Sequence, residues 1–256
     1  MNRIDKIRLI RKKLNQGEVS IGSWIQIPNN LTAEILGDAG YDWVAIDQEH
    51  GAISSYQLPD LCRSVEIGNT LPIVRIASGT SKECKSALDS GAGGIIIPMI
   101  ETKSQLENII QSCQWPPKGK RGVGFSRANY FGKYFERYKE EAANPLIIAM
   151  IENIEAINNI EEILSVNGLD AILIGPYDLS ASLGKTGEID SLEVTNMINL
   201  IIKKAIQHKI SVGIHVVSPE IKELKKQIKN GLTFLPYSID AVFLNRNCQC
   251  PNLSNN

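Results

Sequence analysis

Short runs of apolar residues, rich in β-branched side chains, recur along the chain. Eight of them occupy residues 21–27, 43–47, 72–76, 94–98, 146–151, 171–175, 211–214 and 232–235. The apolar positions follow one another rather than alternating with polar ones, as in strands that are buried on both faces of a parallel sheet. The pattern therefore predicts eight parallel strands.

Stretches with apolar residues at helical spacing lie between these runs, at residues 32–39, 82–90, 103–114, 154–165, 194–208 and 219–230, and a first helix is expected at 2–16. Eight strand–helix units in about 250 residues match the α/β architecture of a (β/α)8 or TIM barrel. A doubly wound open sheet uses the same alternation and stays open as an alternative at this point. One segment, 115–144, is expected to be an irregular insert with a functional role.

No linker rich in Pro, Gly or Ser divides the 256 residues. We therefore expect a single domain over residues 1–256, with the barrel core at about 20–245 and a polar tail at 246–256.

The charge balance excludes several classes of partner. The chain has 27 Lys and Arg against 28 Asp and Glu, with no block of one sign, so it offers no electrostatic footprint for nucleic acid or an anionic membrane. No run of roughly 18 to 20 apolar residues could span a bilayer, and the first helix lacks the apolar core of a secretory signal. We therefore expect a cytoplasmic protein.

The five cysteines are odd in number and scattered, which favours reduced thiols over a disulfide framework. Cys248 and Cys250 lie close together, but no second pair of ligands follows them. A zinc site there is therefore disfavoured.

Polar residues stand where several predicted strands end, which is where a barrel places its catalytic groups. The main candidates are Asp47, Glu49, His50, Arg75, Glu152, Tyr177 and Asp178, and weaker ones are Gln26, Asn29, His215 and Asp240. The candidate groups are expected to meet at one rim of the barrel.

Glu152 and Asp178 are oxygen donors without a neighbouring cysteine or histidine, which suits Mg²⁺ or Mn²⁺. The alternative is that each carboxylate only caps a helix. Arg75 lies in an apolar strand and needs an anionic partner, either a substrate oxygen or Asp47 or Glu49. His50 follows two acids at a strand end, as expected for a general base near neutral pH.

Five separated motifs carry a family resemblance. They are residues 41–50 (YDWVAIDQEH), 72–75 (PIVR), 121–124 (RGVG), 151–152 (IE) and 174–180 (IGPYDLS). Together they resemble the HpcH/HpaI family of metal-dependent pyruvate aldolases, in the same order and from about residue 22 to 240. The resemblance strengthens the prediction of a barrel with a metal site.

The resemblance implies a class II lyase that cleaves a 4-hydroxy-2-oxo acid, such as a 2-keto-3-deoxy sugar acid or a 4-hydroxy-2-oxo dicarboxylate, into pyruvate and an aldehyde. Glu152 and Asp178 match the family's ligands for Mg²⁺, Mn²⁺ or Co²⁺. Arg75 matches the residue that steadies the keto or enolate oxygen. His50, paired with Asp47, matches the base, which acts through a metal-bound water.

The family resemblance also implies substrate-binding residues and an assembly. The backbone at Tyr177 and Asp178 matches the docking point of the pyruvate carboxylate, at the start of a short helix. Trp24 matches an apolar pocket residue, and Gly124 is counted among the substrate-binding residues. Family members form homo-oligomers, commonly hexamers built as trimers of dimers with an exchanged C-terminal helix.

Two departures from the family pattern concern the aldehyde side of the substrate. Met150 stands where the family frequently has glutamine, and residues 235–240 lack a glycine before the Ser-Asp pair. The physiological aldehyde therefore stays open.

Two further functions stay open as alternatives. One is an acyl-CoA lyase of the citryl- or malyl-CoA type, which would require a basic surface that the motifs do not show. The other is a non-catalytic barrel that binds oxo acids, which the full set of competent residues disfavours. A Schiff-base mechanism is also disfavoured, because no lysine stands at any of the eight strand ends.

Overall fold

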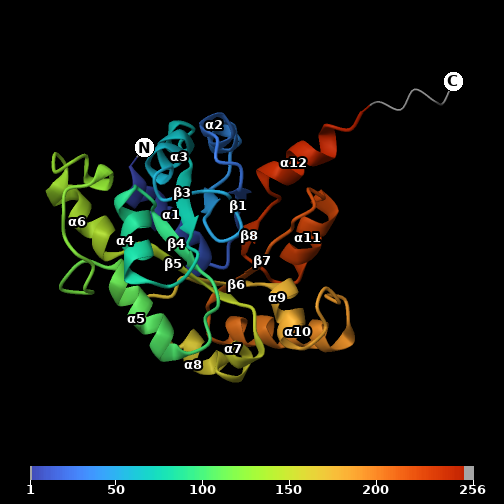
Figure 1. Ribbon diagram of the computed structural model, residues 1–256. Coiled ribbons are helices and arrows are strands. Elements are labelled where there is room, and N and C mark those ends of the chain that lie inside the picture. Colours follow the sequence, from blue (N-terminus) through green and yellow to red (C-terminus); the bar gives the residue numbers. More distant parts are fainter. Residues whose placement is uncertain (1, 251–256) are drawn as a thin grey trace.

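The strands of the protein form a parallel barrel (Figure 1). The computed structural model describes residues 2–250. The strands are β1 (Ser20–Ile25), β2 (Trp43–Asp47), β3 (Leu71–Arg75), β4 (Gly94–Ile97), β5 (Leu146–Ile151), β6 (Ala171–Ile174), β7 (Ser211–Ile214) and β8 (Phe234–Pro236). Each strand from β1 to β6 pairs in parallel with the next along the chain, and β8 pairs with β1. This consecutive order excludes the doubly wound sheet and confirms the barrel.

The barrel closes between β7 and β8 through a few backbone hydrogen bonds. Thr233 N–H donates to the Val212 carbonyl (2.9 Å), and Val216 N–H donates to the Pro236 carbonyl (3.0 Å). A Cβ atom on Gly213 would lie 1.7 Å from the Phe234 carbonyl oxygen. Glycine at position 213 is therefore required for the two strands to approach so closely.

A ring of helices surrounds the strands (Figure 1). The helices are α1 (Arg3–Asn15), α2 (Asn30–Asp38), α3 (Leu58–Ile67), α4 (Ser81–Asp89), α5 (Lys103–Cys113), α6 (Phe135–Ala143), α7 (Ile154–Asn158), α8 (Ile160–Leu164), α9 (Pro176–Ser182), α10 (Leu192–Gln207), α11 (Ile221–Lys229) and α12 (Asp240–Asn247), with a 3-10 turn η1 at Arg127–Asn129. Within residues 2–250, no helix combines the length and the apolar character needed to cross a membrane.

The structure corrects several expectations about local structure. The segment 115–144, expected to be irregular, contains η1 and α6, whose Tyr138 and Ala142 pack in a small cluster with Trp115. Two short helices that meet at Asn159 replace the single helix expected at 154–165. The tail expected from residue 246 begins later, because α12 continues to Asn247, and residues 251–256 lie outside the described residues.

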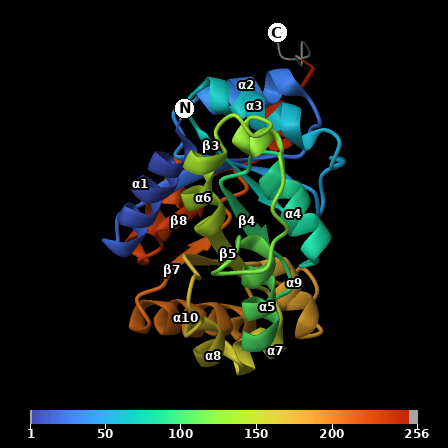
Figure 2. The same cartoon turned by 90° about the vertical axis from the view of Figure 1, so that its left-hand side faces the viewer.

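The apolar core has two layers, one between the strands and the helices and one inside the barrel. Ile7, Ile10 and Leu14 of α1 belong to the inner layer. There the rings of Trp43 and Phe234 stack with their centroids 4.3 Å apart. Figure 2 shows α1, in dark blue, lying against the strands next to β8.

Polar contacts fix α1 at the amino ends of the strands. Arg11 contacts Asp170, just before β6, and Lys13 contacts Asp42, just before β2. Ser211 Oγ, at the start of β7, donates to a carbonyl of α1. Because α1 covers the amino ends of the strands, the opposite rim is left for the functional groups.

Candidate active site

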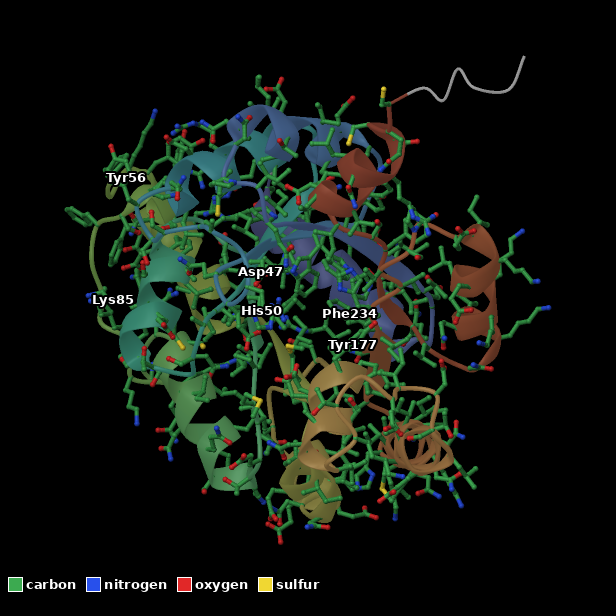
Figure 3. All side chains as sticks on the ribbon, turned by 45° about the vertical axis from the view of Figure 1, so that its right-hand side comes forward. Asp47, His50, Tyr56, Lys85, Tyr177 and Phe234 are labelled. Carbon is green, nitrogen blue, oxygen red and sulfur yellow. The ribbon has the colours of Figure 1, made fainter. Side chains whose placement is uncertain are left out.

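The carboxyl ends of neighbouring strands bring the main candidate side chains together. Asp47 ends β2, Arg75 ends β3, Glu152 follows β5, and Asp178 lies in the first turn of α9 after β6. Figure 3 shows Asp47, His50 and Tyr177 near the middle of the view, away from the peripheral Tyr56 and Lys85.

Asp47 and Arg75 form a buried, bidentate ion pair. Arg75 Nε donates to Asp47 Oδ1 (2.8 Å), and Arg75 Nη2 donates to Oδ2 (2.6 Å). Gln26 Nε2 also donates to Oδ2, at 2.9 Å. Burial acts to raise the pKa of Asp47, but the hydrogen bonds and charge of Arg75 outweigh burial and lower it. Asp47 is therefore held as a carboxylate that orients Arg75.

Arg75 contacts a second carboxylate and an aromatic ring. Its Nη1 lies 2.8 Å from Glu49 Oε2, outside the direction of a hydrogen bond, so the ion pair leaves this buried oxygen without a hydrogen-bond partner among the described residues. The guanidinium carbon lies 5.1 Å from the centre of the Trp24 ring. Of the partners considered from the sequence, the structure thus supplies Asp47 and Glu49.

His50 does not pair with Asp47 in the way that the motif suggests. Asp47 Oδ1 accepts hydrogen bonds from the backbone N–H groups of Glu49 (3.1 Å) and His50 (3.3 Å). Among the described residues no hydrogen bond joins the His50 ring to Asp47, whose oxygens are already occupied by Arg75, Gln26 and the backbone. The expected contact of the two side chains is not made in this structure, in which Asp47 fixes the main chain of His50, and the role of His50 as a base stays a prediction.

The exposed His50 ring interacts with the charge of Glu49 instead. Burial raises the pKa of Glu49, and the positive charges of Arg75 and His50 oppose that rise. The ring is thus accessible to solvent and close enough to a carboxylate to interact with its charge.

Glu152 is a buried carboxylate with few compensating contacts. Only 2% of its surface is exposed, and Oε1 accepts a hydrogen bond from the Met99 N–H group (2.6 Å). Burial, with the nearby negative charges of Glu49 and Asp178, raises the pKa of Glu152 to about 7. A Cβ atom on Gly175 would lie 2.5 Å from Glu152 Oε2, so glycine there leaves room for the carboxylate.

Tyr177 and Asp178 lie in the first turn of α9 and are exposed. The backbone N–H groups of a first turn have no acceptors within the helix. They are therefore available to an anion at the rim.

The three carboxylates of Glu49, Glu152 and Asp178 leave an excess of negative charge, because Arg75 is already engaged by Asp47 and Glu49. Within residues 2–250, no group of three or more His, Cys, Asp or Glu residues is arranged to hold a metal ion. Two carboxylates can still bind Mg²⁺ or Mn²⁺ when water and substrate oxygens complete the shell. The hard donors and the uncompensated charge of buried Glu152 fit such an ion.

Gly124 makes no hydrogen bond with this group of side chains among the described residues. Gly124 is exposed, and its carbonyl accepts a hydrogen bond from Asn129 in the same segment. The segment contacts the ends of α3 and α4 through Arg127, which binds Glu66 and the Ser90 carbonyl. Trp24, by contrast, lies directly beneath Arg75 as a buried apolar residue.

His215, only a weak candidate from the sequence, lies beneath the site. Its Nε2 donates to the Ser238 carbonyl (3.0 Å), and its ring centre lies 5.0 Å from that of Trp24. Burial lowers the pKa of His215 to about 4, so the ring is neutral near pH 7. Sequence reasoning missed the Met99 N–H group entirely, because a backbone donor leaves no signal in residue type.

Known proteins resemble this chain over most of its length. A family model described as HpcH/HpaI aldolase/citrate lyase matches residues 20–245. A hydroxypyruvate/pyruvate aldolase of Roseobacter denitrificans is 32% identical over 240 residues, which are 93% of this chain and 93% of the relative. A 2-keto-3-deoxy-L-rhamnonate aldolase of Escherichia coli is 32% identical over 235 residues, which are 91% of this chain and 87% of the relative.

A solved structure agrees with these sequence matches. An HpcH/HpaI aldolase/citrate lyase family protein from Burkholderia cenocepacia superposes with a TM-score of 0.87 at 29% identity, covering 93% of this chain and 95% of the other. The chain therefore belongs to the HpcH/HpaI aldolase/citrate lyase family, and it is a lyase built on the (β/α)8 barrel.

Proposed function

We propose that this aldolase cleaves a 4-hydroxy-2-oxo acid, such as a 2-keto-3-deoxy sugar acid or a 4-hydroxy-2-oxo dicarboxylate, into pyruvate and an aldehyde, with the help of a divalent metal ion. One observation carries the proposal. A fixed guanidinium, that of Arg75, lies at the rim beside the buried carboxylate of Glu152, whose negative charge lacks a full counter-charge. Negative charge that develops on an oxo oxygen beside Arg75 would meet the guanidinium, and a divalent ion held by Glu152 would supply a second positive charge.

Arg75 and His50 have separate roles in the cleavage, charge stabilisation and proton removal. The guanidinium, oriented by Asp47, stabilises the negative charge that grows on the C2 oxygen as the C3–C4 bond breaks. The exposed His50 ring takes the proton of the C4 hydroxyl as the C3–C4 bond breaks and the aldehyde forms, and return of a proton to C3 of the enolate gives pyruvate. Trp24, beneath Arg75, keeps water from the inner side of the guanidinium.

The oxo acid also needs a partner for its carboxylate and an electron sink. The free N–H groups at Tyr177 and Asp178 suit the carboxylate, because they point out of the first turn of α9. Glu152 and Asp178 would hold a Mg²⁺, Mn²⁺ or Co²⁺ ion. When bound, such an ion supplies an electron sink for the oxo acid.

The test is pyruvate release from a 2-keto-3-deoxy sugar acid and from 4-hydroxy-4-methyl-2-oxoglutarate, measured before and after EDTA treatment and again after Mn²⁺ is restored. We expect activity to disappear with EDTA and to return with Mn²⁺. Arg75→Ala should lower kcat/KM by about a hundredfold or more.

Three outcomes would contradict the proposal. Full activity in EDTA, or an adduct trapped by borohydride, would replace the metal ion with a Schiff base. Turnover of a malyl- or citryl-CoA ester in the absence of oxo acid cleavage would make the enzyme an acyl-CoA lyase. Binding of pyruvate without turnover of any aldehyde in a broad panel would indicate a non-catalytic barrel.

We also propose that the enzyme works in the cytoplasm as a homo-oligomer, a hexamer built as a trimer of dimers. Light scattering on the eluting peak of a size-exclusion column measures this mass directly. A monomeric mass at micromolar concentration would contradict the assembly.

A further inference from the structure

The segment that follows β8 is hydrogen-bonded to both strands beside it. Tyr237 N–H donates to the Gly22 carbonyl (2.8 Å) of β1, and Ser238 N–H donates to the Val216 carbonyl (2.8 Å) just after β7. Ser23 Oγ donates to the Tyr237 carbonyl (3.0 Å). This segment therefore has a fixed place at the rim where the barrel closes.

Asp240 ends this segment and begins α12, and its carboxylate accepts hydrogen bonds from the backbone just after β1. Oδ1 accepts from the N–H groups of Gln26 (2.9 Å) and Ala241 (2.7 Å), and Oδ2 accepts from Ile27 N–H (3.0 Å). Only 4% of Asp240 is exposed. Across residues 2–250 no Lys, Arg or His lies within ion-pair distance of this carboxylate, so it is stabilised by backbone donors alone.

The residue that Asp240 fixes is itself a contact of the Arg75 site. The side-chain Nε2 of Gln26 donates to Asp47 Oδ2, the same oxygen that accepts from Arg75 Nη2. A continuous chain of hydrogen bonds thus runs from Asp240 through the Gln26 backbone and side chain to Asp47 and Arg75. A second path runs along the floor, from the Ser238 carbonyl to the His215 ring, to Trp24 and to the guanidinium.

We propose that Asp240 is a positioning residue for Arg75, acting through Gln26 and Asp47. The inference rests on the proposed function, because it assigns to Arg75 the oxo oxygen of the substrate. Removal of the Asp240 carboxylate releases two backbone N–H groups after β1, lets the Gln26 amide leave Asp47, and frees the guanidinium to tilt. A tilted guanidinium still attracts the anionic substrate, but it meets the developing oxyanion poorly.

The test compares three variants of the full-length enzyme. Gln26→Met keeps the shape of the side chain and removes only the donor to Asp47. Asp240→Ala removes the carboxylate that binds the backbone after β1, and Asp240→Asn keeps one acceptor oxygen. We expect kcat to fall by about tenfold in Gln26→Met and in Asp240→Ala, with KM changed less than about twofold, and Asp240→Asn to recover most of the loss.

A matched control is Asp170→Ala. Asp170 is also a carboxylate that accepts from a backbone N–H, that of Ile147 (2.9 Å), but it lies at the amino ends of the strands. Its loss should lower the melting temperature and leave kcat of the folded enzyme unchanged.

A second measurement does not depend on turnover. The Nε–H signal of Arg75, assigned by its absence in Arg75→Lys, should exchange slowly with water in the wild type, because Nε is hydrogen-bonded to buried Asp47. Exchange at least about tenfold faster in Asp240→Ala and Gln26→Met is expected.

The two measurements separate the possible failures. Unchanged exchange in both variants would overturn the positioning role, and so would unchanged kcat in an active enzyme. If the wild type released no pyruvate from any oxo acid, the proposed function would fail, and the exchange of the Arg75 signal would still decide whether Asp240 holds that side chain. If Asp240→Ala did not fold, Asp240→Asn, which loses one acceptor oxygen, would carry the test, and exchange of its Arg75 signal at the wild-type rate would overturn the positioning role.

Discussion

Arg75 contacts two carboxylates and an aromatic ring. Its removal leaves the buried charge of Asp47 without a counter-charge. Asp47 has no exposed surface. Loss of one partner from a buried ion pair typically costs about 3–5 kcal/mol, because the other charge stays buried without compensation. We expect Arg75→Ala to lower the free energy of unfolding by about that amount, measured by urea denaturation.

The double variant with Asp47→Asn provides the control for this prediction. Neutralising position 47 should restore part of the stability lost in Arg75→Ala without restoring activity. Equal stability of Arg75→Ala and the wild type would show that the pair adds nothing to the fold.

The buried charge of Glu152 lowers the stability of the fold and serves the proposed function. Its charge is buried beside Glu49 and Asp178, and an amide at this position can still accept the hydrogen bond from Met99. Glu152→Gln should therefore raise the melting temperature of the metal-free protein by a few degrees, at about 1 kcal/mol, and lower kcat/KM by at least about a hundredfold. Glu155→Gln, exposed in α7, should change neither quantity. A lower melting temperature for Glu152→Gln would contradict a destabilising effect of the buried charge.

His215 makes stability depend on pH. Its pKa is about 4 in the folded chain because of burial, below the usual 6.5, so between these values the unfolded chain binds more protons and stability falls as pH decreases. From pH 7 to pH 5 the free energy of unfolding should drop by about 2 kcal/mol more in the wild type than in His215→Gln. Identical slopes for the wild type and His215→Gln would exclude a neutral buried ring.

At the level of elements, the approach of β7 to β8 depends on Gly213. A methyl group there would collide with the Phe234 carbonyl, which is backbone and cannot move aside without opening the barrel. Gly213→Ala should destabilise the protein by at least about 3 kcal/mol. At Gly122 the nearest atom to an added Cβ is the flexible Lys85 Nζ, at 3.5 Å, so Gly122→Ala should be neutral. Equal unfolding midpoints for the two variants would contradict the close approach.

The strands were predictable because nearly all of their residues are buried, on both faces, and because most of those residues form continuous apolar runs. β2, for example, has the predicted bounds, and β5 does too. Helix α3 has no predicted bounds, although its amphipathic face buries Leu58, Leu61 and Val65 and Pro59 lies in its first turn. The break at Asn159 was missed because asparagine is tolerated within helices and at their ends.

The site was predictable as a list of strand-end residues but not as a set of contacts. The sequence shows a charged residue where an apolar run ends, at Asp47, Arg75 and Glu152. Which carboxylate receives Arg75 depends on side-chain direction and on the pairing of Asp47 with Arg75 in neighbouring strands. For this reason the sequence could not show that Asp47 binds the side chain of Arg75 and the main chain of His50.

At the scale of the whole molecule, a bound metal ion should stabilise the fold. A ligand that binds only the folded state adds about 2.7 kcal/mol when its concentration is a hundred times its Kd. Mn²⁺ at that concentration should therefore raise the melting temperature of the EDTA-treated protein by about 5 to 10 °C. The same titration of Glu152→Gln should give a much smaller shift, and an equal shift in both proteins would remove Glu152 from the metal ligands.

Helix α1 precedes every strand in the chain, yet its apolar face belongs to the cluster inside the barrel, with Leu146, Ala171 and Phe234. During synthesis on the ribosome, Ile7 and Ile10 therefore have no complete surface to pack against until residue 234 has emerged. Helix α1 is made before every strand of the barrel and is among the last elements to find its place. Helix α1 and β8 must meet in one late step, so a protein interrupted shortly before β8 would leave the ribosome with that apolar face uncovered.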